Sequence, residues 1–345
     1  MPSPTQTPSF AVIPGAEVDR ALTGRHIEVT GIIEDAYRLH GAGGTVNPPS
    51  YFLRFPDRPD ARIIALPASV GGDIAVDGIK WISSFPGNIT SGLPRASAVL
   101  ILNDPATGYP LACVESSIIS ASRTAASAAL AARRLSEARG IRPRRVGYIG
   151  TGLIARYVHD FLAGTGWEFD EIGVHDLEAE YAHQFAGTVG ATAGDANVTV
   201  HDGAESLIRG SDLVVFATVA ATPHIDHPGW FAHDPLVLHL SLRDLGTDVV
   251  LSAANFVDDV EHCLKAGTSP HLAEQRVGHR DFIEGTLHDV LTGAAGVPDD
   301  KPVIFSPFGL GVLDLALGKY VYDTVQETGR LDLVEGFFHE TRRYG

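Results

Sequence analysis

The sequence predicts an α/β protein in which a parallel-sheet domain is inserted into an α+β domain. Three observations lead to this fold class. From residue 145 onward, segments typical of strands alternate with segments typical of helices, which is the pattern of a parallel sheet. Before them, short strands follow one another without intervening helices. After them, a last helix is expected over Val312–Thr328, where it would return to the first domain and make that domain discontinuous.

Length and charge indicate two domains and a small ligand. The chain has 345 residues, which exceeds the usual size of a single hydrophobic core. It carries 26 Lys and Arg against 42 Asp and Glu, a formal net charge of −16. This balance argues against nucleic acid or an anionic membrane surface as the main partner. A small anionic substrate remains compatible with the sequence where a few basic residues converge.

Cysteine content and apolar patterning indicate the cytoplasm. Cys113 and Cys263 are far apart in the sequence, which favours a reducing compartment and argues against a disulfide framework or a cysteine-rich zinc site. Residues 1–10 lack the basic and apolar regions of a signal peptide. No apolar run approaches the length of a membrane span. We therefore expect a cytoplasmic protein that binds neither membrane nor nucleic acid.

The first part of the chain predicts an antiparallel sheet followed by a long helix. Residues 1–60 show no lasting helix or strand periodicity. A change to Ala, Ser, Leu and Arg predicts a helix over Glu115–Arg139, which Gly140 and Pro143 end. Four closely spaced strands precede this helix and suggest a meander or half-barrel. They are Tyr51–Phe55, Arg62–Leu66, Gly78–Ser83 and Ala98–Leu102.

The second part predicts a parallel sheet. A helix is expected over Glu178–Gly187, and a last strand within Pro302–Gly311 precedes the C-terminal helix. The other predicted strands are Arg145–Ile149, Glu171–His175, Asn197–His201, Leu213–Ala217, Leu236–Leu242 and Phe256–Val257.

A glycine-rich turn follows the first of these parallel strands. It fits the G-x-G-x-x-G/A fingerprint of dinucleotide-binding sites, with Ala155 as the small last residue. The first glycine allows the tight turn, the second lets a pyrophosphate approach the backbone, and N–H groups at the helix start would face the phosphates. An ordinary glycine turn before a helix is the alternative. The residues assigned to the cofactor are Gly150, Thr151, Gly152, Leu153 and Ile154.

An acidic residue after the second parallel strand indicates which dinucleotide binds. Asp176 lies 21 positions after Ala155, about where the fingerprint places the acid that binds the ribose hydroxyls. A carboxylate there would repel a 2′-phosphate, so we expect NAD rather than NADP. Asp176 could also cap the helix that follows, and neither role excludes the other. Thr218, which follows a predicted strand, is assigned to the same cofactor site.

Basic side chains in apolar segments are candidates for binding the substrate. Lys80 stands in a predicted strand, where burial of its ammonium requires an anionic partner such as a ligand carboxylate. The alternative is an edge-strand lysine that reaches water. Arg123, near the start of the long helix, could bind a carboxylate through two hydrogen bonds or lie on the surface. Arg54 and Arg62 are further candidates that could equally be solvated.

Asp244 is the candidate for proton transfer. It closes the predicted strand that begins at Leu236, at the edge where open α/β sheets bind ligands. A carboxylate beside a nicotinamide could exchange protons with a substrate amine, although Asp is also common in turns. His224 and His227 lie between two prolines without an evident third ligand, which favours a loop over a metal site. Cys113 reads as a buried small hydrophobe.

In this order the motifs resemble the ornithine cyclodeaminase/mu-crystallin family over nearly the whole chain. The resemblance implies a substrate-binding and dimerisation domain, residues 1–128 plus 312–345, and a Rossmann NAD-binding domain, residues 129–311. It also implies a homodimer. Ahead of the fingerprint, the residues that carry the resemblance are Gly78–Trp81, Asn103–Ala112, Glu115 and Arg123–Ala126.

The resemblance also implies roles for single residues. Lys80 and Arg123 match the family's lysine and arginine for the substrate carboxylate, and Asp244 most plausibly matches its proton-transferring aspartate. We therefore place Lys80 and Asp244 among the catalytic residues. Arg54 and Ser97 fall where family members place further substrate contacts. Cyclodeaminases usually continue from this aspartate with a Pro-Gly-Lys type of turn, whereas Leu245–Asp248 here differs, which argues against a cyclodeaminase.

Within the family, the sequence is most similar to enzymes that act on N-(2-amino-2-carboxyethyl)-L-glutamate in siderophore or peptide natural-product biosynthesis. The implied reaction is NAD-dependent oxidation at the glutamate α-carbon, then hydrolysis of the imine to 2-oxoglutarate and L-2,3-diaminopropionate. The alternatives are an ornithine cyclodeaminase, a related imine reductase or amino-acid dehydrogenase, and a crystallin-like nucleotide-binding protein without turnover. The narrower resemblance rests on Arg62–Pro67, Gly71–Gly72, Gly78–Ser83, Arg95–Ser97 and Ile101–Pro105.

Overall fold

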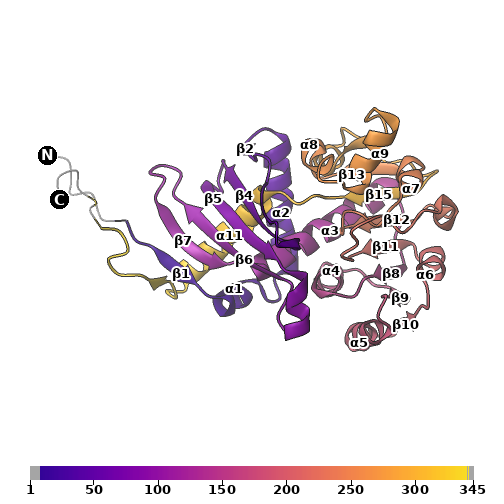
Figure 1. The fold of residues 1–345 in the computed structure, drawn as a ribbon, viewed down its shortest axis with the longest axis horizontal. Coiled ribbons are helices and arrows are strands. Elements are labelled where there is room, and N and C mark those ends of the chain that lie inside the picture. Colours follow the sequence, from indigo (N-terminus) through magenta and orange to yellow (C-terminus); the bar gives the residue numbers. More distant parts are fainter. Residues whose placement is uncertain (1–7, 340, 342–345) are drawn as a thin grey trace. The chain divides into compact units, whose positions relative to one another are not determined.

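The protein's computed structural model describes residues 8–339 and 341 (Figure 1). The chain divides into two compact units, residues 1–123 with 310–345 and residues 124–309. The first unit is built on a mostly antiparallel sheet and the second on a parallel sheet, so the predicted fold class is confirmed. Residues 1–7, part of the segment in which we expect no signal peptide, lie outside the described residues.

The sheet of the first unit has the strand order β16-β1-β7-β6-β5-β4-β2, with β3 paired to β4. The four predicted strands correspond to β3 to β6, which pair in that order as an antiparallel meander, and β7 extends it as a strand that was not predicted. In β5, Lys80 lies opposite Leu66 of β4 and Leu100 of β6. The strands are β1 (Ala11–Ile13), β2 (Thr45–Val46), β3 (Tyr51–Phe55), β4 (Arg58–Val70), β5 (Val76–Ser84), β6 (Ala96–Asn103), β7 (Pro110–Glu115) and β16 (Asp332–Leu333).

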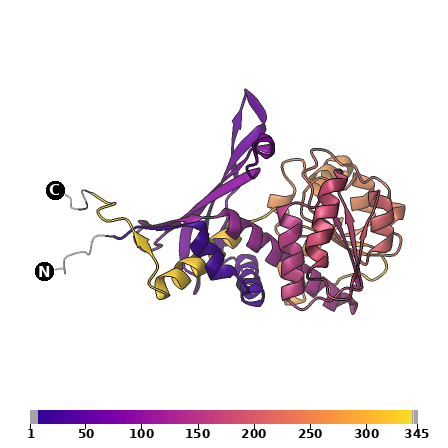
Figure 2. The ribbon, with the colours of Figure 1, turned by 90° about the horizontal axis from the view of Figure 1, so that it is seen from below.

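Helices α1 (Gly15–Leu22), α2 (His26–Gly41) and α11 (Gly311–Glu327) lie on one face of this sheet (Figure 2). Helix α11 packs closely on it, since a Cβ at Gly318 would lie 2.1 Å from Leu100 Cδ2. The prediction of no lasting periodicity in residues 1–60 is wrong, because α1 and α2 occupy this segment. Helix α2 contains a glycine and several β-branched residues of low helix propensity, and burial of its apolar side against α11 stabilises it instead.

The sheet of the second unit is parallel, with the order β10-β9-β8-β11-β12-β15-β13-β14. The chain builds outward from β8 to β10 and then continues from β11 on the other side of β8. This is the Rossmann order, and dinucleotides bind where it reverses. The strands are β8 (Arg145–Ile149), β9 (Glu171–His175), β10 (Asn197–Val200), β11 (Leu213–Phe216), β12 (Leu236–His239), β13 (Ala254–Val257), β14 (Ile283–Thr286) and β15 (Val303–Ser306).

The predicted long helix is α3 (Ser117–Arg139). Strand β12 ends at His239 rather than Leu242, because the chain turns at Leu242, whose φ is +75°. Asp244 therefore lies in the loop beyond the strand. The other helical segments are α4 (Leu153–Gly164), α5 (Ala179–Gly190), α6 (Ala204–Gly210), α7 (Thr247–Leu251), α8 (Val260–Cys263), α9 (Ser269–Val277), α10 (Leu287–Thr292) and the short 3₁₀ turns η1 (Pro86–Ser91) and η2 (Pro228–Phe231).

Two further features concern the expected location of the protein in the cell. Among the described residues, no helix is both long and apolar enough to cross a membrane. Cys113 is half-buried and Cys263 is buried, and both are free thiols. The cytoplasmic location stays a prediction.

Candidate functional site

The turn between β8 and α4 requires glycine at its first position. Gly150 has a φ of +83°, and a Cβ there would lie 2.8 Å from the carbonyl carbon and oxygen of Ala217 and 2.9 Å from the backbone nitrogen of Thr218. Gly152 precedes α4 and caps it without a side-chain hydrogen bond, and nothing lies within 4 Å of its Cβ position. The first N–H groups of α4, from Leu153 onward, are thus open to an anionic ligand such as a pyrophosphate.

Asp176, just after β9, is bonded to this turn. Its Oδ2 accepts hydrogen bonds from the backbone N–H of Thr151 at 2.9 Å and from the Thr151 hydroxyl at 2.8 Å. Its Oδ1 accepts from the backbone N–H of Glu178 at 3.1 Å. Glu178, not Asp176, is the N-cap residue of α5, so the capping alternative is wrong in detail. The carboxylate fixes the fingerprint turn and places a negative charge where the fingerprint expects the ribose.

Several polar side chains converge on Asp244, which is fully buried. Its Oδ1 accepts hydrogen bonds from the Thr218 hydroxyl and from His224 Nε2, the latter at 3.1 Å. Its Oδ2 accepts from the Ser241 hydroxyl. His239 Nε2 lies 3.3 Å from Oδ2 and accepts the backbone N–H of Asp244 at 3.2 Å. Asp244 is therefore the centre of a hydrogen-bond network at the carboxyl ends of β11 and β12.

The network decides the charge of Asp244. Burial favours the neutral carboxyl, but hydrogen bonds from His224 and Ser241 outweigh it and hold the pKa of Asp244 well below its usual range. Asp244 is therefore ionised at neutral pH. Thr218, predicted as a cofactor residue, links this network to the dinucleotide turn, because its backbone nitrogen lies against Gly150.

The sequence analysis missed the roles of His224, Ser241 and His239. For His224 and His227 the sequence favours a loop over a metal site and predicts no catalytic role. The described part of the chain holds no cluster of three or more side chains suited to a metal. His224 instead bonds Asp244, and the ring of His227 lies 5.1 Å from that of Trp230. One sequence feature could have indicated the role of His224: it is a histidine that lies a few residues after the end of a predicted strand.

In the first unit, Lys80 and Arg123 meet on one carboxylate, Asp314 of α11. Lys80 Nζ donates to Asp314 Oδ2 at 2.6 Å and Arg123 Nε donates to Asp314 Oδ1 at 3.1 Å. The Lys80 side chain is 2% exposed and that of Asp314 is 0% exposed. Burial lowers the pKa of Lys80 to about 8, and the charge of Arg123 acts in the same direction while Asp314 opposes it.

Two cations share one anion in this cluster, so the buried groups carry a net charge of about +1 when Lys80 is protonated. Such a charge is costly unless a further anion compensates it. Two alternatives are therefore wrong. Lys80 is not solvated, because its side chain is buried, and Arg123 is not a surface residue, because its side chain is only 12% exposed. Asp314 was not predicted as a site residue, although an acidic residue in an apolar helix requires a partner of opposite charge for the same reason as Lys80.

Further arginines lie on the sheet face that carries Lys80. Cross-strand neighbours share a face, and Arg54 pairs with Arg62, which in turn pairs with Ser84, four residues after Lys80 in β5. Arg95 donates to the Ser84 hydroxyl at 2.7 Å. Burial lowers the pKa of Arg95, and no acidic partner for it occurs within residues 8–339 or at 341. This end of the face is therefore basic.

Ser97 lies elsewhere. It pairs with Ser83, and the two hydroxyls are 2.8 Å apart. Because side chains alternate along a strand, Ser83 and Ser97 point to the opposite face from Lys80. The structure thus brings Lys80 and Arg123 together and leaves Ser97 apart from them.

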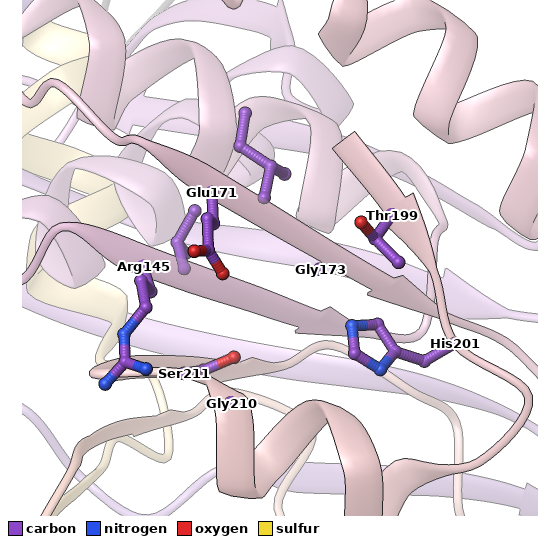
Figure 3. A pocket seen from close by; sticks show the side chains of 9 residues that line it. Arg145, Glu171, Gly173, Thr199, His201, Gly210 and Ser211 are labelled. Carbon is purple, nitrogen blue, oxygen red and sulfur yellow. The ribbon is translucent and has the colours of Figure 1, made fainter. Parts of the chain in front are cut away.

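The second unit also contains a small pocket (Figure 3). It lies beside the first residues of β8 and β9, Arg145 and Glu171, and extends to His201. Arg145 is already paired with Asp212 at 2.6 Å. The dinucleotide turn follows the opposite ends of these strands, so the pocket is not part of the candidate site.

The Rossmann order, the glycine turn and its acidic partner define a dinucleotide-binding protein. The chain belongs to the ornithine cyclodeaminase/mu-crystallin family, whose model matches residues 16–329. This confirms the resemblance predicted from the motifs.

Three similar proteins extend over most of the chain. N-((2S)-2-amino-2-carboxyethyl)-L-glutamate dehydrogenase of Staphylococcus aureus is 28% identical over 88% of this chain and 92% of its own length. Alanine dehydrogenase of Archaeoglobus fulgidus is 27% identical over 86% and 89%. CmnK, known from a crystal structure, is 30% identical in sequence, and the two structures match with a TM-score of 0.85 over 96% of this chain and 100% of CmnK.

Proposed function

We propose that the protein is an NAD-dependent enzyme that oxidises the CH–NH bond of N-(2-amino-2-carboxyethyl)-L-glutamate. The substrate, NAD⁺ and water would give 2-oxoglutarate, L-2,3-diaminopropionate, NADH and a proton. The observation that carries the proposal is the buried Lys80–Asp314–Arg123 cluster, which has one more cation than anion in a chain of net charge −16. A substrate carboxylate would supply the missing anion.

The cofactor part of the proposal rests on the second unit. Nothing lies within 4 Å of the Cβ position of Gly152, which would leave room for a pyrophosphate, and the first N–H groups of α4 are open to it. Asp176 places a carboxylate at the ribose position, which favours NAD over NADP. The names of the Staphylococcus aureus and Archaeoglobus fulgidus relatives, both dehydrogenases, agree with a hydride-transferring enzyme.

The substrate part rests on the basic face of the first unit. N-(2-amino-2-carboxyethyl)-L-glutamate carries three carboxylates, whereas alanine carries one. Lys80 and Arg123 would hold the carboxylate beside the reacting carbon, and Arg95 and Arg54 would hold the more distant ones. This assignment predicts that Arg95→Met raises KM for the three-carboxylate substrate strongly, while Arg330→Met, an exposed arginine of the same unit, leaves it unchanged.

We also propose that the first unit forms the homodimer interface through the sheet face that its helices leave bare (Figure 2). Tyr51, Leu53, Trp81 and Val99 point to this face because their strand positions alternate with Lys80 and its cross-strand partners. All four are exposed in the single chain, Trp81 by 41%. A Trp81→Glu variant should sediment as a monomer, and a dimer that survives it would contradict this assignment.

The test of the reaction is a comparison of substrates with purified protein and NAD⁺. We expect NADH and 2-oxoglutarate from N-(2-amino-2-carboxyethyl)-L-glutamate. An ornithine cyclodeaminase would instead form proline from L-ornithine without net NADH, and an alanine dehydrogenase would form NADH and pyruvate from alanine. Either of these results, with no NADH from the glutamate conjugate, would overturn the proposal.

A further inference from the structure

We propose that His224 transfers the proton of the substrate amine and that Asp244 acts as its positioning residue. The inference rests on the proposed function and refines it, because the family resemblance assigns this proton to Asp244. It follows from the contacts of the two side chains within the second unit.

Asp244 is poorly placed to carry a proton. It is 0% exposed, and both of its carboxylate oxygens already accept hydrogen bonds, from Thr218, His224 and Ser241. A group that takes a proton from the substrate must come within hydrogen-bond reach of the substrate amine, and a carboxylate with no exposed surface does not. The network holds the pKa of Asp244 well below its usual range, so it stays ionised throughout.

His224 has the features that Asp244 lacks. Its backbone N–H donates to the Asp244 carbonyl oxygen at 2.9 Å, and its Nε2 lies 3.1 Å from Asp244 Oδ1, so main chain and ring are both held. A carboxylate oxygen only accepts, so Nε2 carries the hydrogen and Nδ1 carries the lone pair. No hydrogen bond to Nδ1 occurs in the part of the chain that the structure describes, and the side chain is 42% exposed.

The pair lies beside the dinucleotide turn. His224 follows β11 and Asp244 follows β12; β11 is the neighbour of β8 on the side opposite β9, and β12 is the next strand beyond β11. Thr218 donates to Asp244, and its backbone nitrogen lies 2.9 Å from the Cβ position of Gly150. Two hydrogen bonds and one backbone contact therefore connect His224 to the turn expected to hold the cofactor.

With His224 as the only base, the proposed reaction balances in atoms and in charge. The substrate ammonium would first give a proton to His224 Nδ1, and NAD⁺, when bound, would supply the acceptor for the hydride that the neutral amine loses from the glutamate α-carbon. Water would add to the resulting C=N⁺ carbon, both of its protons would move to the leaving nitrogen, and the C–N bond would break, giving the ketone and the ammonium form of the amine. His224 releases its proton to solvent, while the ionised Asp244 stabilises the imidazolium, as an aspartate does in a catalytic triad. His239 contacts Asp244, and Asp226 and His227 are further titratable residues of the same loop as His224.

Three variants test the role in the whole enzyme. His224→Ala and His224→Gln should lower kcat by about 100-fold or more, the usual contribution of a general base, and leave KM for NAD⁺ unchanged. Added imidazole should restore part of the activity of His224→Ala, which a merely structural role would not allow. His227→Gln, three residues further along the same loop, is the matched control and should keep wild-type kcat.

Nitrogen-15 NMR of the substrate-free protein tests the pair without any substrate. The signal that disappears in His224→Gln should show the hydrogen on Nε2. A hydrogen on Nδ1, or wild-type kcat in both His224 variants, would overturn the inference. Absence of NADH from N-(2-amino-2-carboxyethyl)-L-glutamate with the wild type would count against the proposed function alone, because the NMR result does not depend on the substrate.

Discussion

Replacing Asp314 by asparagine keeps the shape of the side chain but removes the charge that Lys80 and Arg123 share. In the first unit its carboxylate lies 2.6 Å from Lys80 Nζ and 3.1 Å from Arg123 Nε, and Asp314 is 0% exposed. Removing one partner of a buried ion pair costs about 3–5 kcal/mol, because an uncompensated charge stays buried. We expect Asp314→Asn to lower the free energy of unfolding of the first unit by about that amount.

The matched control is Asp323→Asn on the same helix. Asp323 pairs with Lys319 at 2.6 Å, but its side chain is 42% exposed, and exposed pairs contribute about 0–1 kcal/mol. Hydrogen exchange in urea, followed at the amides of α11 and β5, reports the first unit separately from the second. Equal losses in the two variants, or a loss below about 1 kcal/mol for Asp314→Asn, would refute the role of Asp314 as the shared counter-ion.

Three further predictions concern binding. Raising the pH through about 8 should weaken binding of the anionic substrate, because Lys80 is charged below its pKa of about 8 and neutral above it; a constant KM across that pH would contradict this. Gly150→Ala should destabilise the second unit by about 2–5 kcal/mol and abolish NAD⁺ binding in calorimetry, since its Cβ would meet the Ala217 carbonyl at a positive φ. Asp176→Ser should weaken NAD⁺ binding and raise the relative use of NADP⁺; unchanged selectivity would exclude Asp176 from cofactor choice.

Much of the fold could be predicted because it depends on local patterns. The strands β8 and β9 agree with prediction at both ends, since apolar runs bounded by turn residues define buried parallel strands. Helix α2 could not be predicted in this way, because Gly31 and its β-branched neighbours disfavour a helix, and packing against α11 and the sheet stabilises it. The end of β12 was missed because a left-handed residue, Leu242, turns the chain where the apolar pattern continues.

The candidate site could be predicted only at positions where the residue type is unusual for the segment in which it lies. Lys80 and Asp244 stand out because a charged side chain in an apolar strand, or at the end of one, requires an explanation. Their partners, Asp314 and His224, come from other elements of the same unit, 234 residues and 20 residues away in sequence. Such convergence depends on sheet order and loop path, which sequence spacing does not contain.

The most direct test of the proposed reaction follows the hydride itself. With N-(2-amino-2-carboxyethyl)-L-glutamate deuterated at the glutamate α-carbon, we expect the deuterium to appear on the nicotinamide ring of the NADH formed, with one 2-oxoglutarate and one L-2,3-diaminopropionate for each NADH. Unlabelled NADH, or deuterium that returns to an amino-acid product without net NADH, would contradict the account.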